Sequence, residues 1–254
     1  MVSTPHSPVS KGITRNQVIR FSVRPVDQHK GPMTRTTNAR LAGSAFLVYI
    51  AAGIASMILS GRATAGEGIA AKLVSVAAHT TEMRISLILS FVMCFSALVL
   101  GVTLYGLTRD EDNELALLGF ACRVGEGLGG ALPLTTLGLL WLATTGVDRP
   151  SPATTDALGT ALQQFGVWKP LSSAILFAVG STIFSYLLLR GEMIPRALAW
   201  LGVISSVLLV VLLPLQFVGL LAGPVTMLMW IPMAAFEIPF GIWLLVTGAR
   251  KTVA

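Results

Sequence analysis

Residues Ile85–Leu107 read ISLILSFVMCFSALVLGVTLYGL and contain no charged side chain. A helix needs about 20 such residues to cross the hydrocarbon core of a bilayer, which is roughly 30 Å thick. Because lipid offers backbone N–H and C=O groups no water, only a helix or a closed barrel can span it. The run lacks the strict alternation of apolar and polar residues that a barrel strand shows. It therefore predicts a transmembrane helix.

Five further stretches have the same character, and the composition of the whole chain agrees with them. Hydrophobic residues make up 54% of the 254 residues and charged residues 12%, whereas a soluble domain usually carries about 25% charged residues. The predicted fold class is therefore all-α, a polytopic integral membrane helix bundle of about six transmembrane helices. The predicted spans are Leu41–Ser60, Ile85–Leu107, Leu115–Thr145, Pro170–Leu189, Ala197–Ala222 and Thr226–Val246.

Two places depart from simple spans. The third span is longer than an upright helix needs, so we expect it to tilt, to kink at Pro133 or to emerge from the bilayer. In the loop before the fourth span, Pro152 is a suitable first residue for a separate helix with one apolar face. This helix is expected to pack against the helix ends or, alternatively, to lie on the bilayer surface or over a cavity. Its apolar face would comprise Leu158, Leu162, Phe165 and Trp168.

Lys and Arg are distributed unevenly between the two sides of the predicted spans. Twelve of the 18 lie on the side of the chain termini and five on the other side, while Arg123 falls inside a span. Because cytoplasmic flanks carry the excess of positive charge, we expect both termini in the cytoplasm. The predicted organisation is a disordered basic arm over residues 1–40, a transmembrane domain over 41–247 and a cytoplasmic tail over 248–254.

The formal net charge of +6 does not indicate nucleic-acid binding, because that requires a basic face on a folded soluble module. Most basic residues flank apolar runs instead, so membrane lipid is the expected partner. The first 40 residues lack the apolar stretch of a secretory signal, and Met33 is an alternative first residue. A second hypothesis for this arm is binding of anionic lipid through Lys11, Arg15, Arg20 and Arg24.

Three charged residues fall near the middle of predicted spans: Arg123, Glu126 and Glu237. Each lies at a depth of roughly 12 to 17 Å, counted at 1.5 Å per helical residue from the same side of the membrane. An ionised side chain at this depth must be paired, hydrated or neutralised. We therefore expect Arg123 to pair with Glu126, which is three residues away on its own helix, with Glu237, or with both.

The surroundings of these charges allow two interpretations. The spacing Gly125-x-x-x-Gly129 permits close approach of another helix, which is a packing role. Glycine-rich backbone beside Arg123 and Glu126 is also typical of a wall lining a cavity, and prolines flank Glu237. The three charges are therefore candidate substrate-binding residues, or else a network that only fixes the helix packing. Hydroxyl groups of side chains within the predicted spans, such as that of Tyr49, are expected to form hydrogen bonds between helices.

No motif for a metal, nucleotide, nucleophile or cofactor is present, so we expect no cofactor and no metal site. His79 lies in a loop without Cys, Asp or His neighbours, and Cys94 and Cys122 lie apart in apolar segments. The sequence does not indicate an oligomeric state.

Several short segments between about residue 33 and residue 252 consist of apolar residues, most of them together with a charged residue or a proline. They are Ala39–Gly43, Leu104–Leu107, Arg123 with Glu126, Ile194–Arg196, and Pro232 followed by Glu237, Phe240, Trp243–Leu245 and Gly248. In these segments the chain resembles the bacterial membrane family called domain of unknown function 4386. The resemblance implies a multi-pass protein of the bacterial cytoplasmic (inner) membrane, and it implies no particular activity.

Three functions are compatible with these features. The leading hypothesis is binding or transport of a small hydrophobic or lipid-like molecule in a polar intramembrane pocket. The second is an intramembrane enzyme in which Glu126 or Glu237, kept neutral by burial, protonates a lipid or isoprenoid substrate, as in a cyclase or isomerase. The third is a structural or regulatory membrane subunit whose charges fix helix register.

Overall fold

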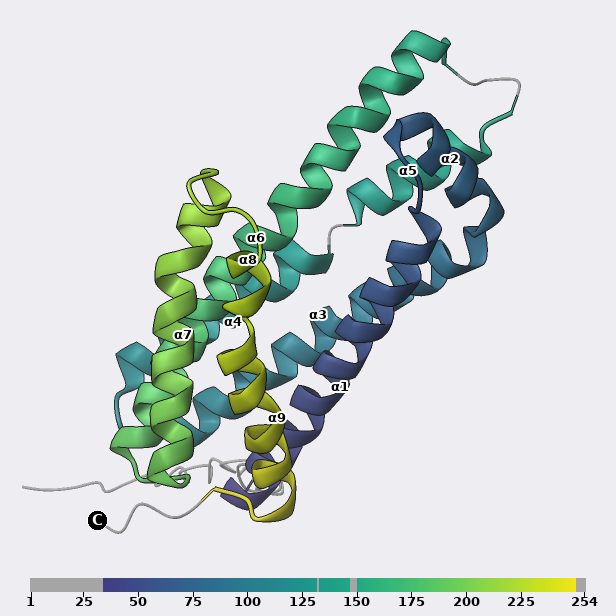
Figure 1. Ribbon diagram of the computed structural model, residues 1–254. Coiled ribbons are helices and arrows are strands. Elements are labelled where there is room, and N and C mark those ends of the chain that lie inside the picture. Colours follow the sequence, from purple (N-terminus) through teal and green to yellow (C-terminus); the bar gives the residue numbers. More distant parts are fainter. Residues whose placement is uncertain (1–33, 132, 147–149, 250–254) are drawn as a thin grey trace, which may run out of the picture. The chain divides into compact units, whose positions relative to one another are not determined.

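The structure, a computed structural model, describes residues 34–131, 133–146 and 150–249. Within these ranges the secondary structure is helical, without a strand (Figure 1). The helices are α1 (Arg35–Ala63), α2 (Gly68–Ala78), α3 (Thr80–Thr108), α4 (Asn113–Ala131), α5 (Leu134–Thr144), α6 (Pro152–Arg190), α7 (Arg196–Phe217), α8 (Val225–Leu228) and α9 (Ile231–Val246). Residues 1–33 of the predicted arm and residues 250–254 of the predicted tail lie outside the described residues.

Six helical segments of the described chain are long and apolar enough to cross a membrane. They are α1, α3, α4 with α5, α6, α7, and α8 with α9. The predicted class, an all-α polytopic membrane bundle with about six spans, is therefore confirmed.

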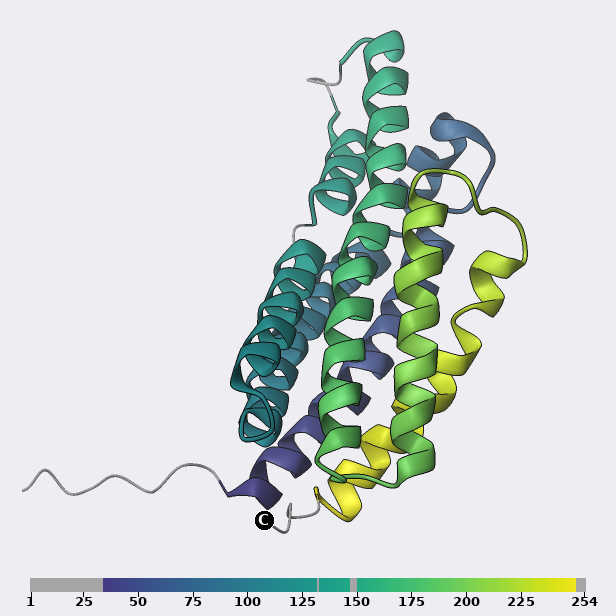
Figure 2. The same ribbon diagram turned by 90° about the vertical axis from the view of Figure 1, so that its left-hand side faces the viewer.

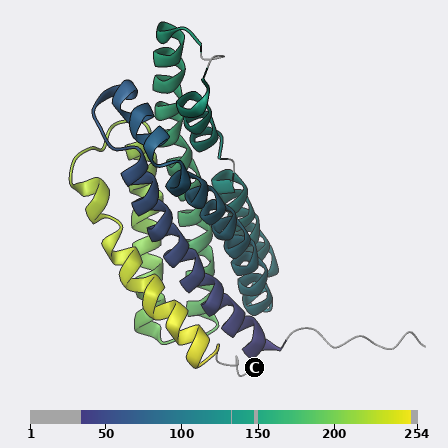
Figure 3. The same cartoon turned by 90° about the vertical axis from the view of Figure 1, so that its right-hand side faces the viewer.

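The long helices follow one another around a closed ring. In chain order α1, α3, α4, α6, α7 and α9 each pack against the next, and α9 packs against α1. Figure 3 shows α9 beside α1, and Figure 2 shows α7 beside α6. Gly248 lies just after the end of α9. A Cβ on Gly248 would lie 3.8 Å from Thr36 Cγ2 and 4.0 Å from Ala39 Cβ, both in α1. The start of α1 and the end of α9 therefore lie together, at what we call the terminal end of the bundle.

Glycines allow the closest helix contacts in the ring. A Cβ on Gly43 of α1 would lie 2.6 Å from the carbonyl oxygen of Gly241 in α9, so the two backbones touch. A Cβ on Gly125 would lie 2.9 Å from Leu176, and one on Gly129 2.8 Å from Ser173 Oγ, both in α6. The predicted close approach at the Gly125-x-x-x-Gly129 spacing is therefore confirmed, and α6 is the helix that approaches.

The first helix begins earlier than its apolar run. Residues 35–40 belong to α1, and the Thr34 side chain caps them by accepting a hydrogen bond of 3.2 Å from the backbone N–H of Thr37. The cap satisfies one of the N–H groups that the first turn leaves open. The predicted limit of the arm at residue 40 is therefore wrong for these six positions.

Pro133 and Pro170 affect the helices around them differently. α4 ends at Ala131 and Pro133 is the N-cap of α5, so the overlong third span is interrupted at the proline, as predicted. Pro170 instead lies inside α6, which runs without interruption from Pro152 to Arg190. A helix does begin at Pro152, as predicted, but the prediction that it is separate from the fourth span is wrong, because it is the first half of α6. A proline removes one backbone hydrogen bond, which tertiary contacts can offset.

The far end of the bundle, opposite the terminal end, carries a second small core. α6 has 39 residues, or about 58 Å at 1.5 Å per residue, roughly twice the hydrocarbon thickness of a bilayer. Its first half therefore extends beyond α7, where it meets α2 and α5 (Figures 1 and 2). Leu73, Val76, Met83, Leu139 and Leu142 form the buried core there. Of the predicted apolar face, Leu162 packs on this core, whereas Leu158, Phe165 and Trp168 are exposed.

Candidate functional site

Arg123 lies in the middle of α4 and is almost completely buried, with 1% of its surface exposed. Glycines on both neighbouring helices leave room for its side chain. A Cβ on Gly101 of α3 would lie 3.2 Å from Arg123 Cβ, and one on Gly180 of α6 3.8 Å from Arg123 Cγ. A larger residue at either position would press against the stem of the arginine.

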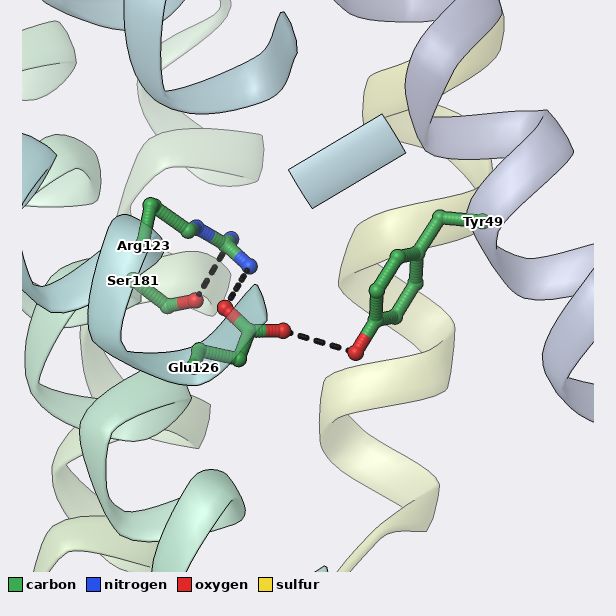
Figure 4. Close-up of polar contacts among 4 residues, drawn as sticks. All are labelled: Tyr49, Arg123, Glu126 and Ser181. Atoms are coloured by element: carbon green, nitrogen blue, oxygen red, sulfur yellow. Dashed lines mark hydrogen bonds and ion pairs between the residues drawn. The ribbon is translucent and has the colours of Figure 1, made fainter. Parts of the chain in front are cut away.

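The guanidinium of Arg123 donates two hydrogen bonds that the structure describes (Figure 4). Nη1 donates to Glu126 Oε2 at 2.9 Å, one turn along the same helix, and Nη2 donates to Ser181 Oγ of α6 at 3.0 Å. The predicted pairing of Arg123 with Glu126 is therefore confirmed. A charge-assisted bond of this kind compensates for the removal of both groups from water.

The second carboxylate oxygen of Glu126 is also bonded. Tyr49 of α1 donates its hydroxyl to Glu126 Oε1 at 2.7 Å (Figure 4). Tyr49, Glu126, Arg123 and Ser181 thus form a network, which we call the tyrosine network, that joins α1, α4 and α6. The interhelical hydrogen bond expected of Tyr49 is confirmed.

Aromatic rings complete the surroundings of the guanidinium. Arg123 Cζ lies 4.9 Å from the ring centroid of Phe177 in α6 and 5.6 Å from that of Phe46 in α1. A cation over an aromatic face is attracted to it, more strongly where water is absent. The positive charge is therefore stabilised by one carboxylate and two ring faces.

Glu237 of α9 is placed differently. The described chain contains no ion pair or hydrogen bond between Arg123 and Glu237, so the second of the predicted pairings is not formed. Glu237 Oε1 is buried, and no group of the described residues forms a hydrogen bond with it. Buried polar atoms are rarely left in this state, and such an exception points to a ligand, a water or a functional role.

The carboxyls of Glu126 and Glu237 line one cavity of about 500 Å³. Pockets that bind small molecules typically measure about 300 to 1,000 Å³ and are mostly apolar with a few polar groups. Ser173 of α6 also lines the cavity, and its Oγ is likewise buried without a hydrogen-bond partner among the described residues. Arg123 is not one of the lining residues and contacts the cavity wall through Glu126.

The cavity follows one face of α1 from Tyr49 through Gly53 and Met57 to Ser60. This distance is about 16 Å at 1.5 Å per residue. Apolar side chains make up much of the wall, among them Met93, Phe177 and Trp230. The carboxyls lie at the Tyr49 end, and Lys169 of α6 lies toward the Ser60 end, where its Nζ donates to the Gly130 carbonyl at 2.9 Å. The space therefore suits an elongated, mainly apolar molecule.

Sequence reasoning identified the three charges but missed other residues of the site. Lys169 directly precedes Pro170, the first residue of the predicted fourth span, so the sequence pattern places it in a loop. Ser173 and Ser181 carry no signal that separates them from other serines of apolar helices. Only the packing of α6 against α4 brings them to the site.

The fold and the cavity define the class: a multi-pass α-helical membrane protein with a buried ion pair beside a cavity between its helices. The chain belongs to the family described as domain of unknown function (DUF4386), which matches residues 41–248. The predicted resemblance is therefore confirmed. No curated protein and no solved structure matches the chain.

Proposed function

We propose that this protein binds a small hydrophobic or lipid-like molecule in the cavity between α1, α3, α4, α6 and α9, as a binding protein or a transporter. The observation that carries the proposal is Glu237, which lines a cavity of about 500 Å³ and whose Oε1 is a buried acceptor without a hydrogen-bond partner among the described residues. A ligand hydroxyl or amine would donate to this carboxyl while the apolar body of the ligand lies against Met93, Phe177 and Trp230. Glu126 has both oxygens bonded and supports the wall.

Trp230 makes the proposal testable, since it lines the cavity. The other four tryptophans, Trp141, Trp168, Trp200 and Trp243, are replaced by Phe in the full chain. A long-chain alcohol brominated in mid-chain is then titrated in neutral detergent. We expect saturable quenching of Trp230 fluorescence. Glu237→Gln should weaken binding about tenfold, since one hydrogen bond to a charged group contributes about 1.5 kcal/mol.

Gly53→Leu is the matched control for this titration. Gly53 lines the cavity, and a Cβ there would lie 3.4 Å from Met93 Cε, which is ordinary contact. The leucine side chain should fill the space without disturbing the helix and abolish the saturable component. Quenching that is linear in ligand, or equal in Gly53→Leu and the parent chain, would show partition into the micelle and refute the proposal.

The second candidate function is an intramembrane enzyme that protonates an isoprenoid substrate. The structure favours Glu237 over Glu126 for that role, because both oxygens of Glu126 accept hydrogen bonds within the protein. A new product from a polyprenyl substrate, lost in Glu237→Gln and retained in Tyr49→Phe, would establish the enzyme in place of a carrier. Unchanged substrate would rule that chemistry out for the compound tested.

We further propose that the terminal end faces the cytoplasm of a bacterial cell across the cytoplasmic membrane, on the basis of the excess of Lys and Arg at that end. A single cysteine in place of the exposed Glu67, in the far-end loop, should react with an impermeant reagent in intact cells. A cysteine at Asn113 should not. The reverse pattern would invert the orientation.

A further inference from the structure

A second cavity of about 360 Å³ lies at the far end of the bundle. Lys72 of α2 and Lys169 of α6 both line it. The remaining polar lining is neutral and consists of Ser60, Thr64, Thr135, Thr136, Gln163 and backbone. No Asp or Glu of the described chain lines this cavity. The far-end cavity therefore has positive charge and hydrogen-bonding groups.

Both lysines lack a carboxylate partner within the described residues. Each side chain is half-buried, and neither takes part in an ion pair there. Lys169 Nζ donates one hydrogen bond, to the Gly130 carbonyl, and an ammonium has two further N–H groups. A partly desolvated ammonium without a carboxylate attracts an anion more strongly than one in water.

The two cavities are neighbours, because Ser60, Lys169 and Pro170 line both. An elongated ligand that occupies both would reach from Lys72 at the far end to Glu237. Together the two cavities are electrically polarised. Their far end carries two ammonium groups, and their deep end carries the unpartnered carboxyl of Glu237 beside the paired Glu126. An anionic group would be attracted to the first end, whereas the wall at the second end has carboxyls and, among the described residues, no cation of its own.

We infer that the ligand is a single-chain amphiphile with an anionic head, which lies between Lys72 and Lys169, and with a chain that extends along α1 and carries the hydroxyl or amine that donates to Glu237. This inference rests on the proposed function and specifies its ligand class. A carboxylate and a phosphate share the chemistry required: negative charge and several acceptor oxygens for ammonium and hydroxyl donors. The polarity of the two cavities fixes the orientation, head at the far end and chain inward.

The chain in which Trp230 is the only tryptophan tests the inference in neutral detergent. It is titrated with three probes that share one mid-chain-brominated C18 chain: the carboxylate, the monoalkyl phosphate and the neutral alcohol. We expect at least one anion to bind about tenfold more tightly than the alcohol. Lys72→Gln should remove about tenfold of the affinity for that anion, since a charge-assisted hydrogen bond contributes about 1.5 kcal/mol. Affinity for the alcohol should change less than twofold.

Arg84→Gln is the matched control, because Arg84 is an exposed cation in the first turns of α3 that lines neither cavity. It should leave all three affinities unchanged. The tighter of the two anions identifies the head group. Equal binding of anions and alcohol, or an equal loss in Arg84→Gln and Lys72→Gln, overturns this inference and leaves the proposed function intact. Failure of all three probes to quench Trp230 saturably overturns both.

Discussion

Glu126 on α4 and Glu237 on α9 line the same cavity and have opposite surroundings. Glu126 accepts hydrogen bonds from Arg123 and Tyr49, one on each oxygen. Glu237 Oε1 is buried and accepts none from the described residues. The same bundle therefore satisfies one buried carboxylate fully and leaves the other available. A satisfied group holds helices together, whereas an available one can receive a ligand.

The strongest test of this comparison removes the cation of the tyrosine network. Arg123→Leu leaves Glu126 buried without its counter-charge. We expect the free energy of unfolding to fall by about 3–5 kcal/mol, the loss typical of breaking a buried pair from one side. Reversible unfolding in mixed detergent micelles measures it.

The triple variant Arg123→Leu, Glu126→Leu, Tyr49→Phe is the control, because it replaces the network with apolar groups and strands no charge. It should recover most of the loss, to within about 1–2 kcal/mol of the parent protein. If the triple variant is as unstable as Arg123→Leu, the size of the side chains and not the pairing of charges determines stability here.

A smaller effect is expected at the outer link of the network. Tyr49→Phe removes the hydrogen bond to Glu126 Oε1 and keeps the ring, so unfolding should require about 1–3 kcal/mol less. The same detergent titration measures this change. A loss near zero would mean that water replaces the hydroxyl from the cavity side, and the contrast between the two carboxyls would then be weaker than the structure indicates.

The smallest effect on stability is expected at Glu237. Glu237→Gln breaks no hydrogen bond or ion pair of the described chain and removes a buried ionisable group. The free energy of unfolding should stay within about 1 kcal/mol of the parent value or rise. Ligand binding, measured by Trp230 quenching, should nevertheless fall. A large loss of stability would show that Glu237 has a structural role, and the distinction between the two carboxyls would fail.

Sequence reasoning was most accurate where a local property decides the outcome. Arg123 and Glu126 are three residues apart on one helix, so their pairing needs no knowledge of other helices. The break between α4 and α5 falls at Pro133, one of the three adjustments predicted for the overlong span. The same reasoning was wrong at Pro170, where α6 continues and brings Lys169 into the cavity wall. Whether a proline ends a helix depends on tertiary contacts, which no local pattern contains.

The sequence by itself determined the class of protein, because apolar runs of spanning length must be helices in lipid. It also determined how far along its helix each buried charge lies, since the rise per residue of a helix is fixed. Only the tertiary structure decided which of these groups meet. The rotation of each helix and its choice of neighbours are set by contacts such as Gly43 with Gly241 and Gly125 with Leu176, between segments far apart in the chain. Those contacts give Glu126 two donors and leave Glu237 facing a cavity.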